Sequence, residues 1–176
     1  MAVLNIDPDH SVAAFSVRHM MISNVHGQFN RISGTIIFDP ADPEMSSVDA
    51  EIDATGIYTG IAKRDEHLKS ADFLDIEKFP KMVFKSSRVE SAGLNRLTIY
   101  GDLTIKGISK PVSLDVECAG PVKDPFEEGT SYGFSASARI NREDFGMTWN
   151  VPMENSGIVV GKKITIMIDV EGDLAM

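Results

Sequence analysis

The chain of 176 residues contains a single cysteine, Cys118, which excludes a disulfide within the chain and a multi-cysteine metal site. Basic residues are also scarce, because 17 lysines and arginines stand against 26 acidic residues, giving a formal net charge of −9. A nucleic-acid surface needs a basic patch, so this balance argues against nucleic acid as a partner and against non-specific docking on anionic headgroups. A neutral lipid held inside the protein is still compatible with this charge.

Long apolar runs are missing as well. No stretch approaches the roughly 18 apolar residues of a membrane span, so we expect no stable membrane insertion. The first residues, MAVLNIDPDHS, lack the charged start and apolar run of a secretory signal, which predicts a cytoplasmic location. The composition, 43% hydrophobic and 24% charged, is typical of a globular protein. Since no repeat or linker is visible, we expect residues 1–176 to form one domain.

The sequence does contain many short runs in which apolar and polar residues alternate. In one of them, Leu97, Ile99 and Leu103 share a face, while Thr98 and Tyr100 lie on the other. A period of two is typical of strands with one buried face and one exposed face. The runs lie at 12–18, 29–38, 47–54, 82–89, 97–105, 112–118, 132–140 and 163–171.

Turn sequences separate most of these runs, as Lys106-Gly107 does between 97–105 and 112–118. Short links imply antiparallel order, because parallel strands need long crossovers. About eight strands with one apolar face are best accommodated by closing the sheet, which removes its edges. We therefore predict an all-β fold, an antiparallel β-barrel of about eight strands. Alternation does not decide whether side chains fill the interior or line a cavity for one ligand.

Residues 61–79 depart from the alternation and show helical spacing of their apolar residues. Ser70 is a plausible N-cap of a second helix, and Pro80 ends the segment. We expect this helical insertion to form two short helices that lie across one opening of the barrel. A further helical turn is expected at 19–24.

Four blocks of sequence carry a resemblance to a known family. The first includes Asp9-His10-Ser11, FSVRHMM at 15–21 and VHGQF at 25–29, and the second runs from Arg64 to Pro80. The third is GDLTIKG at 101–107 with KPV at 110–112, and the fourth lies between Arg142 and Asn150. In these blocks the chain resembles the YceI-like family of polyisoprenoid-binding, lipocalin-like barrels. The resemblance implies an extended lipocalin-like barrel that holds a long isoprenoid or similar amphiphile.

The motifs of common enzyme and metal sites are absent. The four histidines show no i, i+4 pair and no H-E-x-x-H motif, and neither a G-x-S-x-G elbow nor a P-loop occurs. We expect no enzyme, no metal and no required cofactor, although an isoprenoid lipid or quinone is a possible bound group. Two alternatives stay open: a small-molecule enzyme that uses the barrel mouth, and an interaction module with a filled core. A homodimer is also possible.

Alternation and the resemblance together select the candidate ligand-binding residues. They are Phe15, Val17, His19, Met20, Phe29, Leu68, Phe73, Phe84, Leu103, Ile105, Phe134, Ala136, Phe145, Met147, Trp149 and Asn150. The head-group candidates are His19, Arg64, Lys69 and Asn150. A hydrogen bond to the backbone is an equally good explanation for His19, and a helix-fixing ion pair with Asp65 is the favoured one for Arg64. The implied ligand is a polyisoprenoid, an isoprenoid quinone or a fatty amide.

Overall fold

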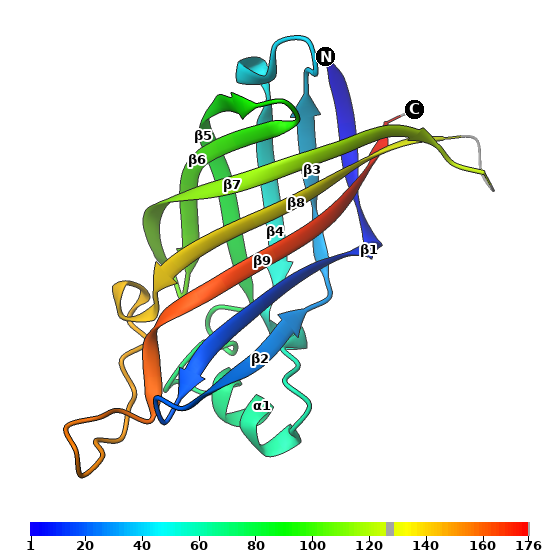
Figure 1. Cartoon of the computed structure of the whole chain (residues 1–176). Helices are drawn as coiled ribbons and strands as arrows, with labels where there is room; N and C mark the ends of the chain where they lie inside the picture. The colour runs from blue at the N-terminus through cyan, green and yellow to red at the C-terminus, as the bar shows by residue number, and fades with distance from the viewer. Residues whose placement is uncertain (126–128, 176) are drawn as a thin grey trace.

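In the computed structural model, which describes residues 1–125 and 129–175, the alternating runs form nine antiparallel strands of one sheet (Figure 1). Strands that follow each other in the chain lie beside each other in the sheet, except for β2 and β3, which flank β1. The strands are β1 (Ala2–His19), β2 (Ser23–Phe29), β3 (Ile32–Phe38), β4 (Ser47–Asp53), β5 (Lys81–Gly93), β6 (Arg96–Ile105), β7 (Ile108–Lys123), β8 (Thr130–Asn141) and β9 (Val160–Leu174).

The sheet closes on itself through β1. Leu4 of this strand pairs with Ile36 of β3 on one side and with Leu174 of β9 on the other. Eight strands therefore form a closed barrel, and β2 is an extra strand that pairs with the second half of β1, from Ala13 to His19, and forms an isolated bridge between Gln28 and Tyr58. The predicted antiparallel barrel of about eight strands is confirmed.

The run at 29–38, predicted as one strand, is split into β2 and β3 at residues 30–31. The cause lies in β1, whose register against β9 shifts between Asp7 and Val12. Such an irregularity bends a strand and changes the direction of its second half. Beyond the bend, β1 leaves β3 and pairs with β2 instead, so the partner strand is interrupted at the same level.

The helical insertion is confirmed, but it contains one α-helix rather than two. This helix, α1, spans Ala62–Lys69, and the short 3₁₀ helices of the described chain are η1 (Pro43–Met45), η2 (Ala54–Gly56) and η3 (Arg142–Phe145). Ser70 ends α1 instead of starting a second helix, because its hydroxyl donates to the carbonyl of His67 at 2.6 Å. Asp75 then takes a φ of 51°, which a right-handed helix does not allow.

The helical turn expected at 19–24 is wrong. These residues form the tight turn between β1 and β2, in which Met20 and Met21 have φ angles of 49° and 64°. The amide of Ile22 donates to the carbonyl of His19 at 3.1 Å and closes the turn. The apolar spacing there reflects an exposed hairpin tip.

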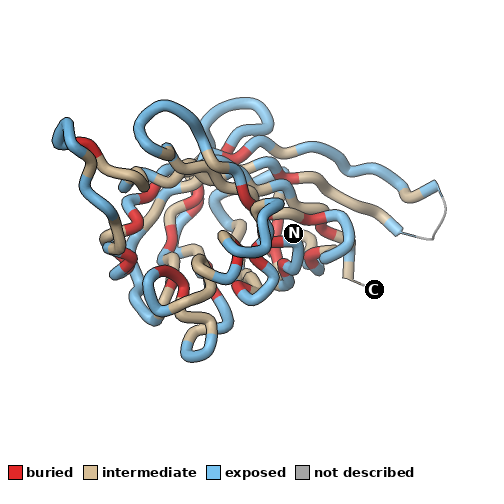
Figure 2. Tube along the Cα trace, turned by 90° about the horizontal axis from the view of Figure 1, so that it is seen from below, coloured by how far each residue is buried: buried red, intermediate tan, exposed pale blue. Residues whose placement is uncertain are grey.

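The strands run between two ends of the barrel (Figure 1). We call the end that carries α1, with residues 54–80 and 142–159, the helix end. The opposite end, with both termini and residues 39–46, is the terminal end. Buried residues lie along the strands, whereas the outer loops are largely exposed (Figure 2). Within the described residues, no helix is long and apolar enough to cross a membrane.

Candidate functional site

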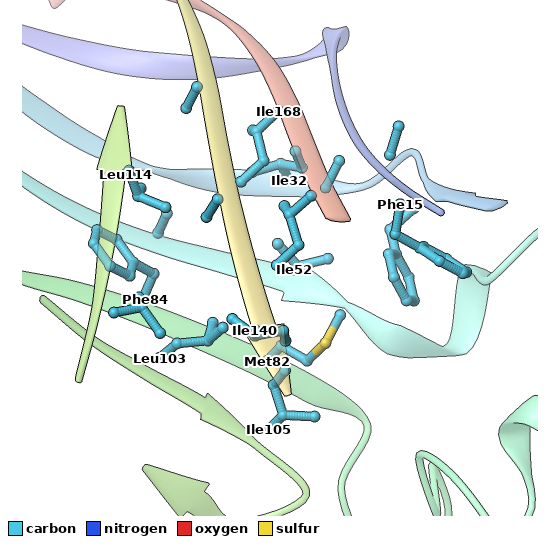
Figure 3. A pocket seen from close by; sticks show the side chains of 18 of the residues that line it. Phe15, Ile32, Ile52, Met82, Phe84, Leu103, Ile105, Leu114, Ile140 and Ile168 are labelled. Carbon is cyan, nitrogen blue, oxygen red and sulfur yellow. The ribbon is translucent and has the colours of Figure 1, made fainter. Parts of the chain in front are cut away.

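A cavity of about 230 Å³ lies inside the barrel and is lined from all nine of the described strands. Each strand contributes the side chains that point into the barrel, which on β8 include Phe134, Ala136 and Ile140. Residues distant in the sequence, such as Phe15, Phe84 and Leu103, point into the same space (Figure 3). The interior therefore combines a packed core with room for a narrow ligand.

The lining is almost entirely hydrocarbon. Among the 37 described residues that line the cavity, only Ser46 and Arg142 carry a nitrogen or an oxygen in the side chain. The others are aliphatic, aromatic or methionine side chains, which offer no general acid, general base or nucleophile. What this space can do chemically is to remove an apolar chain from water.

The structure brings 11 of the candidate ligand-binding residues together around this cavity. Their position follows from the alternation, because residues two apart on a strand share a face. Contact of these side chains with a ligand stays a prediction. The 11 residues are Phe15, Val17, Phe29, Leu68, Phe73, Phe84, Leu103, Ile105, Phe134, Ala136 and Met147.

Three candidates lie apart from the lining for reasons of backbone geometry. His19 ends β1 beside Val160, at the edge of the helix end. Met20 follows in the hairpin turn, where it is 40% exposed. Phe145 is 1% exposed and lies in the apolar core, because η3 turns the chain away from the inward phase of β8.

Asn150 and Trp149 support the helix end without lining the cavity. The Asn150 amide nitrogen donates to the carbonyl of Val160 at 2.8 Å, and its oxygen accepts from the Val160 amide at 3.0 Å. These bonds fasten the loop after η3 to β9 and use both polar groups of the proposed head-group candidate. The Trp149 ring packs against His67 and Phe73, with centroid distances of 4.6 Å and 5.5 Å.

The two other head-group candidates also serve the insertion itself. Arg64 donates from Nε to the Thr59 hydroxyl at 2.8 Å and from Nη2 to the Thr59 carbonyl at 2.7 Å. Asp65 accepts from the same residue, so both side chains fix the turn that precedes α1. Lys69 pairs with Glu66 at 3.2 Å. Neither cation is part of the cavity lining.

The insertion covers the helix end with apolar side chains. Leu68, Phe73 and Leu74 reach the cavity, and the latter two are buried. The ring of His67 packs edge-on against Phe73, and its Nε2 lies 2.8 Å from an oxygen of Asp72. Residues 61–79 therefore cover this end of the barrel and place apolar side chains toward the cavity.

The sequence candidates omit many lining residues, and Arg142 is the charged one among them. The sequence marks it only as part of a family block, although it continues the inward-facing series of β8 beyond Ala138 and Ile140. The alternation of inward-facing residues along β8 is the sequence signal that points to Arg142. Arg142 is 2% exposed, and its guanidinium donates to the carbonyls of Met147, Trp149, Val160 and Gly161, at distances from 2.6 to 3.1 Å. Burial lowers the pKa of Arg142 from its usual value.

Other chemically notable groups lie outside the cavity lining. Asp7, His10 and Glu171 place their side-chain ligand atoms within 4.8 Å of one another at the bend of β1. His10 Nδ1 lies 2.6 Å from Asp7 Oδ2, and this hydrogen bond raises the pKa of His10. Cys118 is half-buried, and burial raises the pKa of its thiol to about 11. A thiol with so high a pKa is a poor nucleophile at neutral pH.

Fold and site together define a class of protein, an antiparallel barrel that encloses an apolar cavity beneath a lid. Residues 4–172 match the model of the YceI-like domain, and the chain belongs to that family. A UPF0312 protein of Pseudomonas syringae pv. syringae (strain B728a) is 36% identical over 145 residues, which cover 82% of this chain and 75% of that protein. The family resemblance predicted from the sequence is thus confirmed.

Solved structures show the same fold. The YCEI protein of Campylobacter jejuni is 32% identical, with a TM-score of 0.75 and coverage of 90% of each chain. A polyisoprenoid binding domain from Saccharophagus degradans reaches a TM-score of 0.70 at 12% identity, covering 99% of this chain and all of that one. At that identity the likeness concerns the fold alone.

Proposed function

We propose that this protein binds an elongated apolar amphiphile inside the barrel and carries or sequesters it. The single observation that carries the proposal is the hydrocarbon-lined cavity within a closed sheet. The Saccharophagus degradans domain, described as polyisoprenoid binding, shares the fold and supports an isoprenoid ligand. A polyisoprenoid, an isoprenoid quinone and a fatty amide all have the required apolar chain.

The energetics of burial agree with such a ligand. Each buried CH₂ group contributes about 0.8 kcal/mol, so about 15 buried carbons contribute about 12 kcal/mol before costs. Association and the ordering of the chain oppose binding by several kcal/mol or more. With a cost of about 4 kcal/mol, the remainder of about 8 kcal/mol corresponds to a dissociation constant of about one micromolar.

Binding is favoured over the two alternatives by the character of the interior. A catalytic site in the barrel would need a positioned acid, base or nucleophile, and the described lining supplies none beyond the hydroxyl of Ser46. An interaction module with a filled core would leave no space of about 230 Å³. We therefore propose a carrier rather than an enzyme.

Displacement of the neutral fluorescent probe N-phenyl-1-naphthylamine tests the proposal. The probe is expected to bind the delipidated protein with an increase in fluorescence, and farnesol or a longer prenol should displace it at micromolar concentration. Glycerol serves as the polar control and should leave the signal unchanged. Failure to take up the probe, or failure of every prenol to displace the bound probe, would contradict binding of apolar chains in the barrel.

The cytoplasmic location and the homodimer stay predictions. Fractionation of cells that make the full-length protein tests the first, and a shortened form in a periplasmic or secreted fraction would contradict it. Sedimentation velocity over a range of concentrations tests the second.

A further inference from the structure

The polarity of the cavity is confined to its two ends. Ser46 precedes β4 at the terminal end, and its hydroxyl oxygen already accepts from the amide of Asp39 at 3.1 Å. Arg142 follows β8 at the helix end and is the one charged side chain in the described lining. A ligand inside this barrel therefore meets hydrocarbon along its length and a cation at one end.

Arg142 forms no ion pair in the described part of the chain. None of the ion pairs there includes it, and the neighbouring carboxylate of Glu143 pairs with Lys162 at 3.1 Å. Buried arginines are normally paired with an acid, because a charge removed from water is costly. Four carbonyls accept most of its hydrogen bonds but carry no formal negative charge, and the acid that acts on Arg142, Glu143, is shared with Lys162.

One N–H group of the guanidinium also has no acceptor among the described residues. Nη2 carries two hydrogens, and among the described residues only the Val160 carbonyl accepts one of them. The group lies 5.9 Å from the centre of the Phe73 ring, a lining residue of the lid. The free donor and the guanidinium charge thus belong to the part of the cavity that the insertion covers.

We propose that the preferred ligand is an acidic amphiphile, whose phosphate or carboxylate lies beside Arg142 and whose apolar tail extends toward the terminal end. The inference rests on the proposed function, because it assigns the head group of the ligand that the cavity holds. A charge-assisted hydrogen bond is stronger than a neutral one, and low local polarity strengthens the attraction further.

A purely structural role for Arg142 makes a different prediction. Its four bonds tie the loop after η3 to the start of β9, and that role is the same whatever the ligand. A structural clamp would therefore leave acids and alcohols of one tail equally bound. The selectivity between matched acid and alcohol ligands separates the two roles without any mutation.

The experiment measures displacement of N-phenyl-1-naphthylamine from the wild-type protein near neutral pH by two matched pairs. The pairs are farnesyl phosphate with farnesol, and palmitoleic acid with palmitoleyl alcohol, each below its micelle concentration. We expect the acidic member to bind about tenfold tighter or more. A preference within the prenyl pair alone identifies a phosphate ligand, and one within the fatty pair alone identifies a carboxylate ligand.

Equal binding of acid and alcohol in both pairs, or tighter binding of the alcohols, would overturn the head-group assignment and leave the proposed function standing. If no member of either pair displaces the probe, the proposed function itself fails and the assignment fails with it.

Arg142→Met locates the effect, with Arg139→Met as the matched control on the outward, exposed face of β8. We expect Arg142→Met to bring the acid-to-alcohol ratio close to one while the alcohols still bind. Arg142→Lys should keep part of the preference, and Arg139→Met should keep all of it. Full acid preference in a folded Arg142→Met protein would contradict the assignment. If that variant does not fold, the wild-type pairs still decide the question.

Discussion

Single side chains on the inward faces of the strands set the room available to a ligand. Ala136 of β8 is half-buried and lines the cavity, whereas Ser137, the next residue, is exposed on the outer face. The two positions lie on one strand and differ mainly in the face they occupy. They therefore offer a matched pair for testing where the ligand lies.

Replacing Ala136 by tryptophan should abolish uptake of a fluorescent prenyl probe, because the indole would occupy space that the chain needs. Overpacking of this kind typically costs about 1–3 kcal/mol of stability, so circular dichroism should still show a folded barrel. The control, Ser137→Trp, places the same ring outside and should bind the probe as the wild type does. Unchanged uptake by folded Ala136→Trp would mean that this position does not line the ligand site.

Cys118 should react slowly with a thiol reagent in the folded protein. Its thiol has a pKa of about 11, raised by burial and by the neighbouring Glu117. At about pH 8 almost none of it is thiolate, which is the reactive form. Modification by 5,5′-dithiobis(2-nitrobenzoate) should be far slower than in the urea-unfolded chain, and equal rates would contradict the burial of this residue.

At the scale of residues, the sequence predicted the lining better than the polar groups. Phe134 and Ala136 could be placed because a strand with one buried face repeats every two residues. Asn150 and Arg64 could not, since their roles depend on backbone groups of Val160 and Thr59 that only the folded loops bring near. Arg142 was missed because the apolar pattern that located the lining gives no weight to a cation.

Among the elements, the insertion at 61–79 differs most from the barrel around it. Its helix α1 is eight residues long and joins no sheet, whereas every strand is held by the ladders of its neighbours. Lids come from the less stable parts of a fold, because they must open while the rest stays closed. A closed sheet leaves the ends as the route for a long ligand, and this segment covers one of them.

Amide hydrogen exchange should therefore be faster in 61–79 than in β6 and β9, and bound lipid should slow it. Phe73→Ala should also speed ligand release, since the ring lines the cavity and packs on Trp149. Hydrogen exchange with and without a prenol, read by mass spectrometry, measures the first effect. Equal protection of the insertion in both states would indicate a fixed plug and entry elsewhere.

Close packing between strands β5 and β6 depends on a glycine. A Cβ at position 101 would lie 2.4 Å from the carbonyl oxygen of Lys85 and 2.7 Å from the Phe84 ring. Gly101→Ala should lower stability by about 1–3 kcal/mol and the melting temperature by several degrees. Gly56→Ala meets no atom within 4 Å and is the control, so similar melting temperatures for both variants would contradict this packing.

Element boundaries were predictable where pattern and turn chemistry agree, and not elsewhere. The link Lys106-Gly107 between β6 and β7 was visible because it interrupts two clear alternations. The split of β2 from β3 was not predictable, since it results from a bend in β1, an earlier strand of the sheet. The second helix was predicted at Ser70 because an N-cap residue and a helix-ending hydroxyl look alike in sequence.

For the whole molecule, closure of the sheet determines what the protein can do. Pairing of β1 with both β3 and β9 leaves the inward faces of eight strands facing one enclosed space. The alternation made this closure predictable, because so many one-face-apolar strands have no better way to bury their apolar side. The cavity itself was not predictable, since a filled core and a lined cavity share the same period of two.

Native mass spectrometry tests most directly whether that space holds a lipid. The protein, purified without detergent and delipidated, would be incubated with a polyprenol and sprayed under gentle conditions, beside Ala136→Trp as the blocked form. A mass increase of one polyprenol per chain in the wild type, absent from the variant, is the expected result. Wild-type protein that stays free of lipid at every concentration, or an equal adduct on both proteins, would contradict a ligand inside the barrel.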